Sequence, residues 1–304
     1  MYPGRINPNP APSPKTTFTS TDPSTSPSQV ATSPLCTDDT LETIPPSAAS
    51  PSNSCTNENP GWLWPVVESG VSLASNAVVN GARWYHNYRV SGLENIPKTG
   101  PVLLVLNHSL ATYDVVLLVR EIEEKTGRTP KPLVDRLFFK VPGVCDLARK
   151  AGMVEGSREN ARDLLNAGEL VIVLPGGMKE ALRPSTEKYD VRWDTRKGFV
   201  RIALETGANV IIGACPAADD IYSVYGNPLT RAVYSTLRAP APVFAGRYYT
   251  PLPMPAPLTH VLSKPIPMPQ IPGDKHLTDS FVDGKHKQLV KVMDSIMTDA
   301  LLVE

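Results

Sequence analysis

Short, continuous apolar runs alternate with segments of helical periodicity between residues 101 and 212. The apolar runs predict buried strands, because a strand covered on both faces has no polar side. Segments with apolar residues three or four positions apart predict helices. We expect strands at 101–106, 137–139, 170–174 and 210–212, and helices at 114–125, 141–149, 158–167 and 197–206. This alternation favours an α/β fold with a mostly parallel sheet flanked by helices.

The pattern weakens after residue 215. Residues 251–272 are rich in proline, and within them residues 260–263 predict a short edge strand, which tolerates nearby proline. Residues 279–303 predict a long amphipathic C-terminal helix. Its expected buried face consists of Phe281, Leu289, Val292, Met293 and Ile296.

An amphipathic segment precedes the alternating pattern. Between residues 62 and 88, apolar residues recur at helical spacing, and Trp62, Trp64, Trp84 and Tyr85 lie at the two ends. Terminal aromatic residues on an amphipathic helix are typical of a membrane interface. The alternative is a helix packed on the domain core with its aromatic residues buried. No run reaches 18 uninterrupted apolar residues, so no clear transmembrane helix is expected.

The 32 prolines are unevenly distributed. Residues 1–60 consist mostly of Pro, Ser, Thr and Asn, and such a segment buries too little apolar area to offset its ordering entropy. The first ten residues have no apolar core of a secretory signal. We therefore expect a disordered tail over 1–60, the amphipathic helix over 61–88 and one folded domain over 89–304, which is long enough for a single sizeable core.

Charge and cysteine content exclude several classes of function. Thirty Lys and Arg residues balance 30 Asp and Glu residues, which argues against a polybasic nucleic-acid-binding protein. The four cysteines form no CxxC pair, so neither a zinc site nor a disulfide framework is expected, and no metal is predicted. Reduced thiols are the simplest interpretation.

His108 is the first candidate for chemistry. It directly follows the predicted strand at 101–106, and Asp114 begins the next predicted helix. A histidine at the carboxyl end of a strand with a carboxylate nearby is typical of a general base and its orienting partner. The alternative is structural: a loop histidine, with Asp114 as a helix N-cap.

Gly176 and Gly177 follow the predicted strand at 170–174. Glycines at a strand-to-helix turn allow backbone N–H groups to approach an anion. A tight turn without a ligand is the alternative. The chain contains no GxxxxGK[ST], GxGxxG or GxSxG motif, so neither nucleotide binding by those loops nor an α/β-hydrolase serine is supported.

Basic residues surround this turn in the sequence. Arg158 begins a predicted helix, and a cation there can hold a polar substrate group. Lys179 leads a basic run that also contains Arg183, Arg192, Arg196 and Lys197. For Arg158 the alternative is a solvated residue at the start of a helix, and a basic run of this kind is usually a solvated surface.

Residues 88–304 resemble the phospholipid/glycerol acyltransferase superfamily. Four blocks in one order carry the resemblance: Asn107-His108 with Asp114, residues 152–158, residues 174–180, and residues 208–213 ahead of Pro216. The third block differs from the Pro-Glu-Gly-Thr-Arg pattern of lysophosphatidate acyltransferases. Its Pro-Gly-Gly, basic residue and Glu-Ala-Leu are similar to the branch typified by transmembrane protein 68 and to diacylglycerol acyltransferase-like relatives. Residues 139–143, 189–193 and 196–199 strengthen that match.

The resemblance implies a glycerolipid acyltransferase-like fold and acyl transfer at the cytoplasmic face of a membrane. An acyl thioester, either acyl-CoA or acyl-carrier protein, would be the co-substrate and a lipid hydroxyl the acceptor, with no other cofactor. His108 would be the general base and Asp114 its partner. The substrate-binding residues implied by the family are Arg158, Gly176, Gly177, Lys179 and Glu180.

Two departures from the family pattern refine these expectations. Five residues separate His108 from Asp114 where four are usual, so the loop is expected to bulge. The phosphate-binding Glu-Gly-Thr-Arg signature is missing, which favours a neutral acceptor such as diacylglycerol or a long-chain alcohol. The alternatives are an acyltransferase of the 1-acylglycerol-3-phosphate type and a non-catalytic lipid-binding protein on the same fold.

Overall fold

The structure, a computed structural model, describes residues 76–136, 139, 148–149, 152–226, 243–271 and 278–303. The chain divides into two units, Met1–Asn53 and Ser54–Glu304, and every described residue belongs to the second. The tail predicted over 1–60 and the first part of the helix predicted over 61–88 lie outside the described residues. The division of the chain into tail, helix and domain therefore stays a prediction.

A seven-stranded sheet forms the centre of the described part of the chain, in the order β1-β9-β6-β2-β5-β3-β4. Neighbouring strands pair in parallel except β6 and β9, which are antiparallel. The strands are β1 (Arg89–Ser91), β2 (Val102–Leu106), β3 (Lys131–Val134), β4 (Val154–Glu155), β5 (Leu170–Val173), β6 (Asn209–Ala214) and β9 (Thr259–Leu262). The mostly parallel sheet expected from the sequence is thus confirmed.

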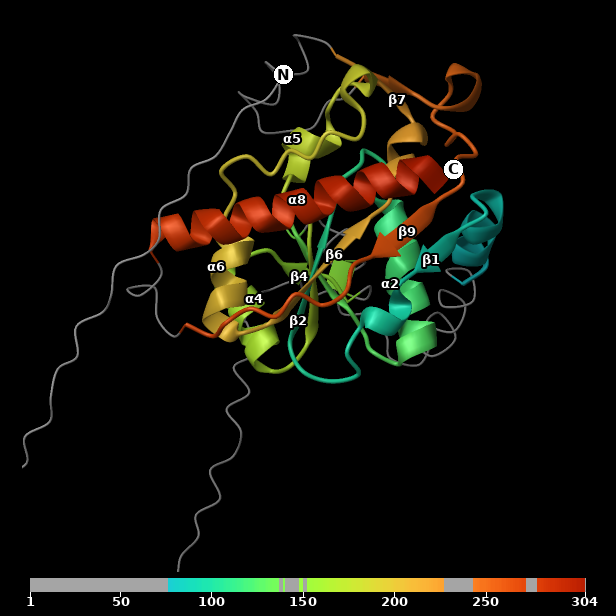
Figure 1. The fold of residues 1–304 in the computed structure, drawn as a ribbon. Coiled ribbons are helices and arrows are strands. Elements are labelled where there is room, and N and C mark those ends of the chain that lie inside the picture. Colours follow the sequence, from blue (N-terminus) through green and yellow to red (C-terminus); the bar gives the residue numbers. More distant parts are fainter. Residues whose placement is uncertain are drawn as a thin grey trace, which may run out of the picture. The chain divides into compact units, whose positions relative to one another are not determined.

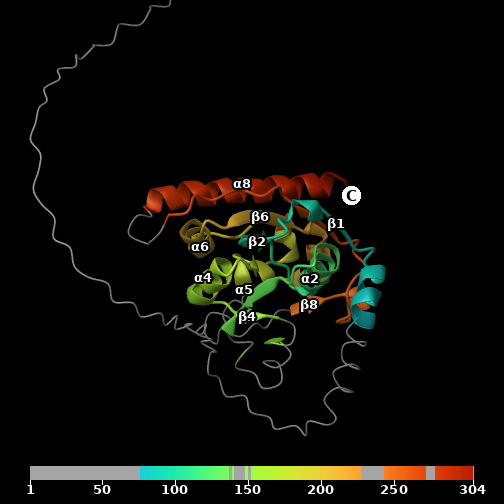
Figure 2. The same cartoon turned by 90° about the horizontal axis from the view of Figure 1, so that it is seen from below.

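Helices cover both faces of this sheet. Helix α2 (Tyr113–Thr126) packs on one face, and α4 (Arg158–Asn166), α6 (Gly198–Thr206) and α8 (Asp279–Val303) pack on the other. Figures 1 and 2 show α8 and α2 on opposite sides of the central strands. Successive side chains of β2 alternate between these two cores: Leu103 and Val105 join one cluster, and Leu104 and Leu106 join the other. Both faces of β2 are therefore buried, as its unbroken apolar run predicts.

Local sequence signals account for the helix ends. The side chain of Ser157 caps α4 by accepting a hydrogen bond from the Asn160 N–H at 3.0 Å. Helix α2 ends at Gly127, whose φ of 71° is the left-handed conformation that glycine adopts without strain. These signals mark where α4 begins and where α2 ends.

Shorter elements complete the described structure. A helix spans residues 76–85, and a two-stranded antiparallel ribbon pairs β7 (Ser223–Tyr225) with β8 (Val243–Ala245). The remaining elements are α5 (Gly177–Ala181) and the 3₁₀ helices η1 (Leu93–Asn95), η3 (Ser185–Glu187), η4 (Pro216–Asp220) and η5 (Arg247–Tyr249). Among the described helices, none combines the length and the hydrophobicity that a membrane crossing requires.

The structure corrects several sequence-based expectations. Residues 260–263 were expected at a sheet edge, but β9 lies between β1 and β6, because β1 supplies a further strand. Phe281 was expected on the buried face of the C-terminal helix but is exposed; Val282, one position on, is buried instead. The buried stripe of α8 consists of Val282, His286, Leu289, Met293 and Met297.

The segment before β4 also differs from expectation. The strand predicted at 137–139 and the helix predicted at 141–149 lie almost entirely outside the described residues. On the side of β5 away from β2, the neighbouring strand is β3. It pairs Lys131 with Val171 and Pro132 with Ile172. A lysine and a proline at the start of β3 hide it from a search for apolar runs.

Candidate active site

Three strand ends meet at one edge of the sheet, because β6, β2 and β5 are neighbours and run parallel. His108 follows β2, the turn at residues 175–177 follows β5, and Cys215 follows β6. Asn107 joins two of these ends. Its Oδ1 accepts a hydrogen bond from the Cys215 N–H at 3.0 Å, and its Nδ2 donates to the Cys215 carbonyl at 3.4 Å. Open α/β sheets bind their ligands at such strand ends.

His108 is partly buried and is held through one ring nitrogen. Its Nδ1 lies 2.9 Å from the backbone carbonyl oxygen of Ser109. A carbonyl oxygen only accepts hydrogen bonds, so Nδ1 carries a proton. Burial lowers the pKa of His108, and the charges of Arg183 and Arg196 add to this, whereas the Ser109 carbonyl and the Asp114 charge oppose it. In the neutral imidazole, Nε2 therefore has the lone pair that can accept a proton.

Asp114 lies in the first turn of α2 and is buried. Its Oδ2 is 3.5 Å from Nε2 of His260, a residue of β9, and its Oδ1 has no hydrogen-bond partner among the described residues. Within the same residues, no hydrogen bond joins Asp114 to His108. The loop turns sharply before α2, where Thr112 has a φ of 54°. In this geometry Asp114 acts on His108 through its charge, and its role as the partner of the base stays a prediction.

The Gly-Gly turn is shaped by internal packing. A β-carbon at Gly176 would overlap the carboxylate of Glu180, and one at Gly177 would overlap the guanidinium of Arg196. Arg196 Nη1 donates to the carbonyls of Pro175 and Gly176 at 2.9 and 2.7 Å. The Gly177 N–H donates to the Leu174 carbonyl at 3.1 Å and is already used within the turn. Both glycines are therefore required by their neighbours, whether or not a ligand binds here.

Glu180 is completely buried beneath this turn. Its Oε1 accepts a hydrogen bond from the backbone N–H of His108 at 3.4 Å and lies 3.4 Å from Nη1 of Arg183. Its Oε2 has no hydrogen-bond partner among the described residues. Burial raises the pKa of Glu180 to about 7, although the nearby charge of Arg183 opposes this. Glu180, expected to bind substrate, is thus placed where it supports the backbone of His108.

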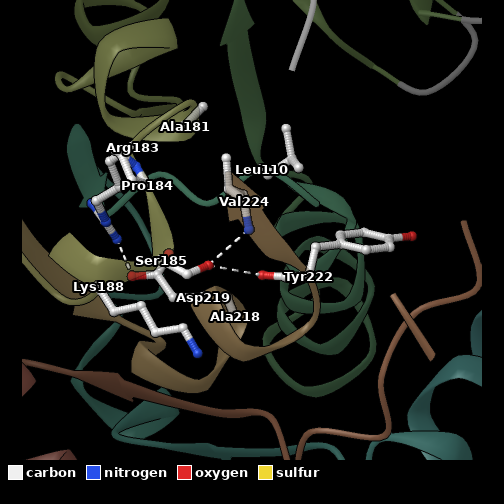
Figure 3. Close-up of a pocket in the computed structure, with 10 residues that line it drawn as sticks. All are labelled: Leu110, Ala181, Arg183, Pro184, Ser185, Lys188, Ala218, Asp219, Tyr222 and Val224. Carbon is white, nitrogen blue, oxygen red and sulfur yellow. Dashed lines mark hydrogen bonds and ion pairs between the residues drawn. The ribbon is translucent and has the colours of Figure 1, made fainter. Parts of the chain in front are cut away.

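Arg183 joins Glu180 to a second carboxylate. Its Nη2 pairs with Asp219, and its Nη1 donates to the Asp190 carbonyl at 2.8 Å. Figure 3 shows the Arg183 and Asp219 side chains pointing toward one another. Burial raises the pKa of Asp219, and the Arg183 charge opposes the rise. Sequence reasoning placed Arg183 in a solvated run; only its spacing of three residues from Glu180 signals a helical ion pair.

The other two predicted substrate-binding residues are exposed cations. Arg158 begins α4 near Gly198, the first residue of α6, and makes no hydrogen bond or ion pair with the described residues. Lys179 has only a long contact, 3.8 Å, with the carboxylate of Asp194, and 63% of its side chain is exposed. Both ammonium and guanidinium groups are accessible to an anionic ligand.

Asp114, Cys215 and His260 form a buried cluster, each with one possible ligand atom within 4.8 Å of the others. His260 is also linked to Tyr88, whose hydroxyl lies 3.1 Å from Nδ1. Structural zinc sites usually have four ligands, with cysteine and histidine predominating. The Tyr88 and Asp114 contacts already engage both ring nitrogens of His260. Sequence reasoning did not identify His260, because no motif surrounds it.

An apolar cavity of about 610 Å³ adjoins the first turn of α2. Helix 76–85, α2 and the segment at 247–253 form its walls. Tyr113 lines the cavity and Asp114 follows it in the chain, so one turn of α2 serves both the cavity and the polar site. The apolar lining includes Val78, Val79, Ala82, Tyr85, Val116, Leu117, Leu252 and Pro253.

Known proteins resemble this chain over most of the described structure. A sequence profile of diacylglycerol acyltransferase matches residues 124–299. A "DGAT1/2-independent enzyme synthesizing storage lipids" from Bos taurus is 32% identical over 69% of this chain and 59% of its own length. The protein of that name from Homo sapiens is 31% identical over 67% of this chain and 63% of its own length. The matches thus span about three fifths of these relatives.

A solved structure is also similar. The 1-acyl-sn-glycerophosphate acyltransferase PlsC from Thermotoga maritima is 20% identical, with a TM-score of 0.42 over 75% of this chain and 82% of its own. The diacylglycerol acyltransferase profile includes Gly176, Gly177 and Glu180 but begins after His108 and Asp114. Because that profile matches more than half of the chain, the assignment is clear: the chain belongs to the diacylglycerol acyltransferase family.

Proposed function

We propose that this protein is an O-acyltransferase that moves a fatty acyl group from an acyl thioester to the hydroxyl of a neutral lipid, with His108 as the general base. The observation that carries the proposal is the hydrogen bond from His108 Nδ1 to the Ser109 carbonyl. It leaves Nε2 as the proton acceptor at the carboxyl end of β2. The lowered pKa of His108 keeps the imidazole neutral and ready to accept a proton.

The reaction needs one proton shuttle and no covalent enzyme intermediate. Nε2 of His108 removes the proton from the acceptor hydroxyl as that oxygen attacks the thioester carbonyl carbon. The tetrahedral intermediate then collapses, the C–S bond breaks, and the imidazolium returns its proton to the leaving sulfur. The products are an ester and a free thiol. The negative charge of Asp114 stabilises the transient imidazolium, and the charges of Arg183 and Arg196 favour return of the proton.

The apolar cavity supports a substrate with a long aliphatic chain. Its volume, about 610 Å³, lies within the range of small-molecule sites, and its walls are almost wholly apolar. Among the described residues that line it, Arg247 carries the only charged side chain. An acyl chain in this cavity would lie beside Tyr113, next to the turn that carries Asp114.

Two observations bear on the acceptor. The bovine and human relatives are named for synthesising storage lipids, which favours a neutral acceptor such as diacylglycerol or a long-chain alcohol. The exposed cations Arg158 and Lys179 favour an acceptor with a phosphate, as in a 1-acylglycerol-3-phosphate acyltransferase. The neutral acceptor is preferred because the Pro-Gly-Gly block at residues 175–177 lacks the Glu-Gly-Thr-Arg phosphate-binding signature, in agreement with the names of these relatives.

A non-catalytic lipid-binding role is the second candidate. The observation that favours it is the missing hydrogen bond between Asp114 and His108 in the described structure. In that case the cavity would bind a lipid and His108 would be a loop residue.

Membrane attachment is part of the proposal. Three side chains that line the cavity are also well exposed: Val78, Tyr248 and Leu252. Trp84 and Tyr249, each next in the chain to a lining residue, are exposed as well. Tyr248 and Tyr249 both have left-handed backbone conformations, with φ of 55° and 60°, a strained geometry for bulky residues. Aromatic residues held outward in this way would insert at the interface of the cytoplasmic leaflet.

A panel of acceptors tests the proposed function. Purified full-length protein is incubated with radiolabelled acyl-CoA or acyl-carrier protein and with diacylglycerol, a long-chain alcohol or a 1-acylglycerol-3-phosphate in mixed micelles. The proposal predicts labelled ester with a neutral acceptor. Ester only from the phosphate-bearing lipid would identify the alternative acyltransferase, and lipid binding without any ester would support the non-catalytic role.

A further inference from the structure

His260 occupies a buried position that links three distant parts of the chain. It lies in β9, where it is opposite Val90 of the neighbouring β1, and it is 1% exposed. Tyr88 immediately precedes β1, and its ring packs edge-on against the imidazole with 5.7 Å between ring centres. Asp114 approaches the same imidazole from the first turn of α2. The fold thus brings one aromatic hydroxyl, one imidazole and one carboxylate into a row.

The positions of the protons in this row follow from the chemistry of the groups. Asp114 Oδ2 lies 3.5 Å from His260 Nε2, and a carboxylate oxygen attracts an N–H and repels a nitrogen lone pair, so this contact favours the proton on Nε2. In a neutral imidazole, Nδ1 is then the acceptor, and the Tyr88 hydroxyl at 3.1 Å is the donor. Burial raises the pKa of Tyr88 well above its usual value, which keeps this hydroxyl protonated. Tyr88 thereby selects the tautomer of His260 that donates to Asp114.

Only one oxygen of Asp114 is engaged in this way. Its Oδ1 is buried and has no hydrogen-bond partner among the described residues. Of the charged side chains that act on the pKa of His108, Asp114 has the largest effect. Contact with His260 on one side restricts the position of the Asp114 carboxylate.

We propose that His260 is a positioning residue of the acyl transfer. It holds Asp114 through Oδ2, leaves Oδ1 to stabilise the imidazolium that forms at His108, and is itself oriented by Tyr88. This inference rests on the proposed function, in which His108 is the base. His260 does not touch the substrate; it acts through Asp114.

Steady-state kinetics of ester formation test the proposal. His260→Leu removes the imidazole that faces Oδ2 of Asp114, and we expect kcat to fall by about 10- to 100-fold, on the order of a lost polar contact with a charged group. The KM of the acceptor should change little. His260→Gln should recover most of the activity, because its amide N–H replaces Nε2–H. His286→Leu is the matched control: it removes another buried histidine, which packs against Trp193 and Phe199 in the opposite core.

A double-mutant cycle separates positioning from a general effect on folding. In an Asp114→Asn background, His260→Leu should have little further effect on kcat, because the group through which it acts is gone. Independent, multiplying losses would overturn the proposal, as would equal losses in His260→Leu and His260→Gln. Thermal unfolding of each variant identifies any that fail to fold, and Tyr88→Phe then serves as the milder perturbation. It should lower kcat less than His260→Leu does.

A readout without turnover distinguishes failure of this inference from failure of the proposed function. In ¹⁵N-histidine spectra of the full chain, we expect His260 to be protonated at Nε2 and its signal to shift on Asp114→Asn. Protonation at Nδ1 alone would overturn the inference even if the enzyme is active. The zinc content of the purified protein is a further check. One zinc atom per chain in the wild type that is lost in both Cys215→Ser and His260→Gln would show that the cluster is a metal site and would overturn the inference. An inactive wild type with the expected spectrum would refute the proposed function and leave the His260–Asp114 contact established.

Discussion

The Nδ1 atom of His108 lies 2.9 Å from the backbone carbonyl oxygen of Ser109, the next residue in the chain. This backbone contact fixes the proton on Nδ1; the Thr112 hydroxyl oxygen lies farther from the same nitrogen, at 3.5 Å. Asp114, expected to do so, instead faces His260. Two tasks are thus separated in this site. The backbone orients the imidazole of His108, and Asp114 stabilises its charged form.

That separation predicts a partial effect for Asp114→Asn. The tautomer of His108 should persist, and only the stabilising charge is lost, so we expect kcat to fall by about 10- to 100-fold. Enzymes whose aspartate fixes the tautomer lose about 10⁴-fold on the same change. Measuring kcat for ester formation distinguishes the two cases. A loss as complete as that of His108→Ala would contradict the separation.

Glu180 makes the stability of the protein depend on pH. Its pKa is about 7 in the folded protein and 4.5 in an unfolded chain, so between these values the folded state binds the additional proton. Stability therefore falls as the pH rises from about 4.5 to 7, by up to about 3 kcal/mol for this group. Glu180→Gln should remove this fall and leave only the contribution of other groups such as Asp219.

Urea unfolding at several pH values between 4.5 and 8 measures the effect of Glu180→Gln. Glu94→Gln, at an exposed carboxyl of η1, controls for the change in net charge. An unchanged slope of the free energy of unfolding against pH in Glu180→Gln would show that Glu180 is not held as described.

In the Gly-Gly turn, adding a single methyl group at Gly176 should disturb the local packing. The new methyl group of Gly176→Ala would overlap the Glu180 carboxylate, so we expect a loss of about 1–3 kcal/mol in the free energy of unfolding. Because Glu180 also binds the His108 backbone, activity should fall with it. Gly284→Ala, in open space within α8, should stabilise by up to about 1 kcal/mol. Equal effects at both glycines would refute this explanation.

Exposed aromatic residues predict where the protein binds membranes. Trp84→Ser and Tyr249→Ser each remove a side chain that is more than four fifths exposed. If both insert into lipid, each change should weaken binding to phosphatidylcholine vesicles by about tenfold, the effect of burying one such side chain. Sedimentation with vesicles measures this. Leu302→Ser, at an exposed apolar residue near the end of α8, is the control, and equal weakening there would argue against a specific surface.

The regular part of the fold was predictable from the sequence. The continuous apolar runs of β2, β5 and β6 correspond to strands buried on both faces, and this placed His108 and the Gly-Gly turn at one sheet edge. The strands β1, β3 and β4 were missed because they are short or interrupted by polar residues and proline. Their pairing depends on neighbours that local periodicity does not reveal.

The composition of the site was only partly predictable. Sequence order indicated that His108 and Gly176 approach one another, but Glu180 was expected to bind substrate and is buried beneath His108. The contact between Asp114 and His260 joins residues 146 positions apart, and no local pattern signals a pair at that separation. Tertiary packing decides these partners.

The central claim is that His108 is the base of an acyl transfer, and the rate of ester formation with and without its imidazole tests it most directly. Full-length protein with acyl-CoA and diacylglycerol in mixed micelles is compared with His108→Ala and with His286→Ala, which removes a buried histidine in the opposite core. The account predicts that the wild type and His286→Ala both form labelled ester, and that each releases one free thiol for every ester formed. His108→Ala should form ester at least about 100-fold more slowly. Undiminished ester formation by a folded His108→Ala protein would contradict the claim.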